Sequence, residues 1–217
     1  MSVHSSFNKA FPTTMSLIVA EENGADSLKC EFIWAGDSRG YFLDQGGLCQ
    51  ITVDDINVNV DDAFQNLIDD GIMTNMVNGE KEFKLHYRVL ELKRWRNLPA
   101  MLISATDGAF SYFQTSMEFE FLILDTLNSA KTPAEWKAML KSRLDEIAGD
   151  DYVLAIGLFG FENFKAVGKH FSNRYSDIKG IMNQIDAIDP KQPDRIEQLR
   201  KIWNTYKSAY YRENGEK

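Results

Sequence analysis

Residues 13–52 form a series of short β-rich segments separated by glycine-containing turns. Strands are expected at residues 13–20, 28–35, 40–43 and 48–52, and Gln45-Gly46-Gly47 turns the third into the fourth. Short strands joined by tight turns pair with their neighbours in antiparallel fashion. This part of the sequence therefore predicts an antiparallel sheet.

The sequence beyond residue 52 adds helices to this pattern. Further strands are expected at residues 82–92, 100–105 and 152–158, the last as a buried strand. A helix is predicted from Pro133 to about Ala148, because Thr132 is a good N-cap, Glu135 stands three residues later and Gly149 can end the helix. Residues 116–128 fit either a helix or a strand, but their length favours a helix. A short helix is expected at 61–68. Together these segments predict an α+β fold.

From residue 164 onward the apolar residues recur at helical spacing. The chain is divided into a core at 1–165 and a helical appendage at 166–217, with Pro190 and Pro193 breaking the appendage into a hairpin. The apolar stripe of the hairpin consists of Ile178, Ile181, Met182, Ile185, Ile196, Leu199, Trp203, Tyr206 and Tyr210. It could form an oligomer with a partner helix through residues 172–212, but packing on the chain's own core is favoured.

The charge of the chain restricts its partners. Lys and Arg number 24 against 32 Asp and Glu, so the net charge is −8, which repels nucleic acid and anionic lipid. The most basic stretch, residues 84–96, alternates polar and apolar residues and predicts a strand with one wet face instead. We expect neither nucleic-acid nor membrane binding.

Several other classes of protein lack support in the sequence. No apolar run approaches the roughly 18 residues of a membrane span, and the first residues do not form a secretory signal. The two cysteines, Cys30 and Cys49, are too few for a disulfide framework and fit a reducing cytoplasm. The three histidines lack zinc-ligand spacing, and nucleotide-cradling glycine loops are missing. A cytoplasmic location is expected.

Carboxylates stand at the ends of apolar strands in three places. Asp37 and Asp107 each follow an expected strand, and Asp150-Asp151 precede another. If these strand ends converge, the carboxylates repel one another unless a cation lies between them. Mg²⁺ and Mn²⁺ prefer oxygen ligands of this kind. Each place also has a plainer interpretation, since Gly36-Asp37-Ser38-Arg39 and Asp107-Gly108 are common turn sequences and Asp150-Asp151 could simply lie in a solvated loop.

The order of these motifs resembles that of the metal-dependent protein phosphatases, the PPM or type 2C Ser/Thr phosphatases. The resemblance covers about residues 11–160. The matching motifs are Gly36-Asp37-Ser38-Arg39, Leu48-Cys49-Gln50-Ile51-Thr52-Val53-Asp54-Asp55, Thr106-Asp107-Gly108 and Asp150-Asp151. The resemblance implies two packed antiparallel sheets flanked by helices, with a site for Mg²⁺ or Mn²⁺ at one end.

The resemblance also implies roles for individual residues. Asp107 and Asp150 would be direct metal ligands, and Asp37 would lie in the second shell or on a third, weaker metal. Arg39 would support the turn, with a contact to phosphate as the less favoured alternative. The remaining residues that would support the site are Gly36, Ser38, Gly108 and Asp151.

One motif of the family has no match in the sequence. The family's N-terminal part carries an Asp-Gly-x-Gly-Gly-like loop that supplies the carboxylate bridging two metals, and Asp70-Gly71 lacks the further glycines. The expectation is a phosphatase-like chain without this N-terminal part, with weak or no turnover on a phosphoprotein substrate. The alternatives are that a separate N-terminal segment is its partner, or that the chain is a non-catalytic binding or regulatory module.

Overall fold

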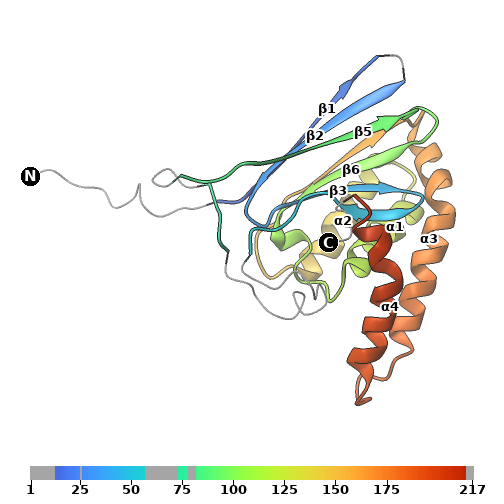
Figure 1. Ribbon diagram of the computed structural model, residues 1–217. Coiled ribbons are helices and arrows are strands. Elements are labelled where there is room, and N and C mark those ends of the chain that lie inside the picture. The colour runs from blue at the N-terminus through green and yellow to red at the C-terminus, as the bar shows by residue number, and fades with distance from the viewer. Residues whose placement is uncertain (1–12, 25, 57–72, 78–81, 214–217) are drawn as a thin grey trace, which may run out of the picture.

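The computed structural model of the chain describes residues 13–24, 26–56, 73–77 and 82–213 (Figure 1). The helix predicted at 61–68 and the Asp70-Gly71 pair lie outside the described residues. Among the helices described, none has the length and apolar character needed to cross a lipid bilayer.

The described strands form two antiparallel sheets. The first has the order β1 (Met15–Glu22), β2 (Ser27–Ala35) and β5 (His86–Lys93). The second has the order β4 (Gly47–Gln50), β3 (Arg39–Asp44), β6 (Ala100–Ala105) and β7 (Leu154–Phe159). The predicted α+β fold with two packed antiparallel sheets is confirmed.

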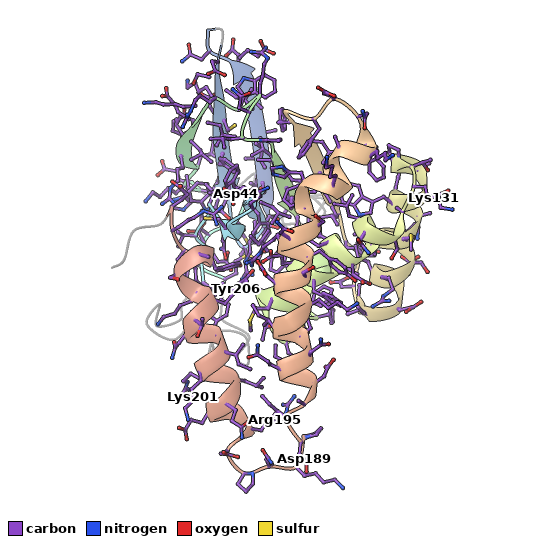
Figure 2. All side chains as sticks on the ribbon, turned by 90° about the vertical axis from the view of Figure 1, so that its right-hand side faces the viewer. Asp44, Lys131, Asp189, Arg195, Lys201 and Tyr206 are labelled. Carbon is purple, nitrogen blue, oxygen red and sulfur yellow. The ribbon has the colours of Figure 1, made fainter. Side chains whose placement is uncertain are left out.

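The described helices lie on one side of this sandwich (Figure 1). They are α1 (Ser116–Ser129), α2 (Pro133–Ile147), α3 (Phe164–Asp186) and α4 (Arg195–Tyr210). Thr132 caps α2 as predicted, accepting a hydrogen bond from the Glu135 backbone N–H. The long helices α3 and α4 run side by side and extend beyond the sheets (Figure 1 and Figure 2).

Two apolar clusters hold the layers together. One lies between the sheets, where Phe32 and Trp34 of β2 share a cluster with Leu102 of β6. The other lies between the second sheet and the helices. The outer face of the first sheet has a different character, because Leu17 and Tyr87 are 47% and 56% exposed there and none of the described helices covers them.

Some sequence predictions need correction. The strand expected to be buried at 152–158 is β7, at the edge of its sheet, and Leu158 is 36% exposed. Ile196 was expected in the apolar stripe but is 54% exposed, because it lies on the outer side of α4. Helix α2, by contrast, ends at Ile147, within one residue of its predicted end, where the backbone of Ala148 turns to an extended conformation. The first strand begins at Met15, two residues later than expected.

The rest of the hairpin stripe packs on the chain's own core. Trp203, Tyr206 and Tyr210 are at most 4% exposed and share one cluster with sheet and helix residues. This confirms the favoured interpretation of the stripe. A domain boundary between residues 165 and 166 stays a prediction.

A buried carboxylate joins three helices. Glu120 of α1 has no exposed surface and accepts hydrogen bonds from Arg174 Nε at 2.6 Å and Nη2 at 2.9 Å. Tyr206 of α4 donates its hydroxyl to the same carboxylate at 2.5 Å. Figure 2 shows Tyr206 between α4 and α3, whereas Lys201 points away from them. A buried charge needs such partners, so these bonds determine how the helices are placed.

Replacing the buried carboxylate should destabilise the fold strongly. We expect Glu120→Ala to lower the free energy of unfolding by about 3–5 kcal/mol, because it leaves the Arg174 guanidinium buried without its partner. Urea denaturation followed by circular dichroism measures this. The control is Glu197→Ala, which removes an exposed pair with Lys201 on α4 and should change stability little. Equal effects of the two substitutions would contradict the role given to Glu120.

Candidate functional site

One end of the second sheet gathers the residues that the sequence singled out. Arg39, Ala105 and Leu154 stand in register across β3, β6 and β7. Asp37 precedes the first of them by two residues and Asp107 follows the second by two residues. The segment around Asp150 leads into the third strand at the same end. We call this end of the sheet, with its three adjoining segments, the rim.

Direct contacts tie the β6 and β7 segments together at the rim. Thr106 donates its backbone N–H to the carbonyl of Val153 at 3.0 Å and accepts the Val153 N–H on its hydroxyl at 2.8 Å. A Cβ atom added to Gly108 would clash with the Asp151 carbonyl oxygen. Glycine at position 108 therefore permits a close approach of the two segments.

Asp37 is the most buried of the three rim carboxylates. Its Oδ1 is shielded from solvent and has no hydrogen-bond partner within the described part of the chain. Burial raises the pKa of the Asp37 carboxyl, and the negative charge of Asp107 raises it further. Asp107 and Asp150 are exposed, and Asp150 Oδ1 accepts the Asp151 backbone N–H at 2.7 Å.

The fit of this donor set to a metal ion is partial. The carboxylate oxygens and the unpartnered Asp37 Oδ1 suit a hard divalent cation such as Mg²⁺ or Mn²⁺. However, the described residues contain no group of three or more His, Cys, Asp or Glu side chains placed to hold a metal ion. The roles of Asp107, Asp150 and Asp37 toward a metal stay predictions.

Arg39 is held beside the rim by a bidentate ion pair. It donates from Nε to Asp54 Oδ1 at 3.0 Å and from Nη2 to Asp54 Oδ2 at 2.5 Å, and its guanidinium lies 4.1 Å from the centre of the Phe110 ring. Gln50 donates to the same carboxylate at 3.0 Å and accepts from the Tyr210 hydroxyl at 2.8 Å. A chain of polar contacts thus links the end of α4 to the rim.

A second carboxylate, Asp55, holds the Gly36 corner. Its Oδ2 accepts the Gly36 backbone N–H at 3.0 Å and the Asn75 amide at 2.6 Å, and its Oδ1 lies 2.7 Å from His86 Nε2. The His86 ring stacks on Trp34 with 5.1 Å between centroids. Sequence reasoning missed this cluster, because its members stand far apart in the chain. The nearest signal was the Asp54-Asp55 pair at the end of the second motif.

The side chain of Ser38 is buried and contacts another hydroxyl group of the chain. It is 1% exposed, and its hydroxyl lies 2.7 Å from that of Thr14. This contact joins the rim turn to the residue that leads into β1. A role for Ser38 in supporting the turn stays a prediction.

The comparisons with known proteins support the fold alone. No protein-family model matches the sequence. No curated protein matches it. Among solved structures, the serine/threonine phosphatase of S. agalactiae matches with a TM-score of 0.53 at 18% identity, over 73% of this chain and 63% of that one. This likeness confirms the sandwich fold expected from the resemblance.

Other matched structures carry similar names. The Mycobacterium tuberculosis serine/threonine phosphatase PstP/Ppp matches at 21% identity with a TM-score of 0.46, over 68% of this chain and 60% of that one. A structure of the PstP catalytic domain in complex with 2 manganese ions matches at 21% identity with a TM-score of 0.44, over 68% and 58% of the two chains. The chain spans about three fifths of the length of the solved phosphatases that it matches.

The close approach at Gly108 can be tested with two glycine substitutions. We expect Gly108→Ala to destabilise the fold by about 1–3 kcal/mol, because the added methyl group forces the β6 and β7 segments apart. Gly168→Ala in α3 is the matched control: it meets no atom within 4 Å and should stabilise by about 0.5–1 kcal/mol. Thermal unfolding measures both. A neutral Gly108→Ala would show that the rim segments are not in contact.

Proposed function

We propose that this chain is a phosphatase-like protein that binds Mg²⁺ or Mn²⁺ weakly at the rim. As the 217-residue polypeptide it would hydrolyse phosphoserine or phosphothreonine in proteins slowly or not at all. The observation that supports the proposal is the register of β3, β6 and β7, which brings Asp37, Asp107 and Asp150 to one end of the sheet. The likeness in fold to a serine/threonine phosphatase points the same way.

The proposal assigns a task to each rim residue. Asp107 and Asp150 would bind the ion directly, and Asp37 would lie beside it or hold a further, weaker ion. Gly36, Ser38, Gly108 and Asp151 would support these carboxylates. Arg39 would hold Asp54 and Phe110 next to the turn, since its guanidinium already contacts both side chains.

A bound divalent ion would supply positive charge for a phosphate group and would make water a better nucleophile. The protein's own contribution is to hold carboxylates on rigid strand ends, where their spacing changes little. Few carboxylates also mean a loose site, because Mg²⁺ gives up its water reluctantly. This is the physical reason for expecting weak binding and little turnover.

A non-catalytic binding or regulatory module is the second candidate. The sequence has no Asp-Gly-x-Gly-Gly-like loop, and the described residues show no group of three metal-ligating side chains. Such a chain would keep the fold and bind a phosphoprotein or a separate N-terminal segment. A cytoplasmic location belongs to the proposal in either case, supported by the free thiols of Cys30 and Cys49.

Metal binding can be measured separately from turnover. We expect Asp107→Asn to weaken Mn²⁺ binding, measured by isothermal titration calorimetry, by at least about tenfold, since even indirect contacts of a metal contribute that much. The control is Asp189→Asn in the loop joining α3 and α4, far from the sheet (Figure 2). Unchanged affinity in Asp107→Asn would remove Asp107 from the site.

Turnover distinguishes a weak phosphatase from a chain without activity. With saturating Mn²⁺ and a phosphothreonine peptide, we expect a rate well below about 1 s⁻¹, which is a low value for an ordinary enzyme. The released phosphate is measured. A slow rate abolished by Asp107→Asn supports a phosphatase with residual activity, and metal binding without release excludes that residual activity. A rate above about 1 s⁻¹ would refute weak catalysis.

A further inference from the structure

A groove of about 960 Å³ lies between the edge strand β7 and helix α2. From β7 it is lined by Leu154, Ile156 and Leu158, which are alternate residues and therefore point to the same face of the strand. From α2 it is lined by the apolar side chains of Trp136, Leu140 and Leu144 and by the charged side chains of Lys137, Lys141 and Asp145. The apolar part of the lining thus follows the direction of the strand, and charged side chains border it.

The strand that borders the groove has one unpaired edge. β7 pairs with β6 on one side, and no strand of the described ranges pairs with its other side. An edge of this kind presents a row of backbone donors and acceptors that another strand can satisfy. The apolar side chains of such a strand would enter the groove beneath α2 at every second position.

The charges near the two ends of β7 argue against a second copy of the chain as the occupant. Asp150 and Asp151 stand before the strand and the exposed Glu162 stands after it. Antiparallel pairing of two β7 strands would place Glu162 of one copy beside Asp150 and Asp151 of the other, and like charges at such positions repel. Of the two lysines that α2 contributes to the lining, Lys141 is paired with Asp145, and Lys137 lies near the start of the helix, away from the segment that leads to Asp150. The rim end of the groove therefore favours a positively charged occupant.

We propose that β7 and α2 dock an extended segment of another polypeptide. The segment is apolar at alternate positions and carries Lys or Arg at the end that lies beside Asp150 and Asp151. Its backbone pairs with the free edge of β7, and its apolar side chains fill the groove, a mode of recognition known as β-augmentation. The inference does not depend on the proposed phosphatase function, because it requires neither metal nor turnover.

The proposed docking groove reaches the rim. Asp150 and Asp151 line the groove and also belong to the rim. A segment bound along β7 therefore ends next to the candidate metal site.

Synthetic peptides on the full chain test the proposal. The probes are labelled peptides of alternating valine and threonine with two lysines at the C-terminal end, for an antiparallel strand, or at the N-terminal end, for a parallel one. We expect one of them to bind at least about tenfold more tightly, by fluorescence anisotropy, than the same peptide with glutamates in place of lysines. N-methylation of alternate amides should abolish binding, because it removes the backbone donors but keeps the side chains.

Two substitutions in β7 locate the bound peptide. Ile156→Lys puts a charge into the groove and should weaken binding by at least about tenfold. Ala155→Lys is the matched control on the opposite face of the strand and should bind normally. Circular dichroism and thermal unfolding check that both variants fold, and the N-methylated peptide keeps the test valid if Ile156→Lys does not.

Several outcomes would overturn the proposal. They are equal binding of the lysine and N-methylated peptides, no binding of either lysine peptide, and unchanged binding in folded Ile156→Lys. Sedimentation equilibrium supplies one more: a dimer that Ile156→Lys dissociates would assign the groove to a second copy of the chain.

Discussion

The buried carboxylate of Glu120 is the constraint on which the placement of the helices depends. A charge with no exposed surface needs partners, and Arg174 and Tyr206 supply them from α3 and α4. Once α4 is held there, its last residue, Tyr210, reaches Gln50, and Gln50 reaches Asp54 at the rim. The helical hairpin is therefore connected by hydrogen bonds to the candidate site at the end of the sheet.

At the rim, the proposed metal site is weak, but the backbone that carries it is well supported. Arg39 and Asp54 form a bidentate pair, and Asp55 holds the Gly36 corner, so the backbone around Asp37 is well supported. The rim has fewer carboxylates than a tight site for a divalent cation needs. The groove along β7 ends at the same place, so the proposed docking site and the proposed metal site share one end of the sheet.

The sequence predicted much of the fold because the relevant signals are local. Alternating apolar residues, glycine turns and the Thr132-Pro133 helix start each act within a few residues, and the observed strands and helices agree with them. The cluster of Asp55 and His86 was missed because these residues are 31 positions apart. No local pattern indicates that two such side chains will meet.

The sequence by itself determined the types of element, their order and the motifs that place acids next to strands. Only the tertiary structure decided which strand lies at an edge, which tyrosines are buried and which carboxylates become neighbours. The physical reason is that helix and strand preferences come from short-range periodicity, whereas edges, burial and charge pairing come from the packing of distant segments. Thus Tyr152–Leu158, apolar enough for a buried strand, begins outside β7 and continues along the exposed edge of the sheet.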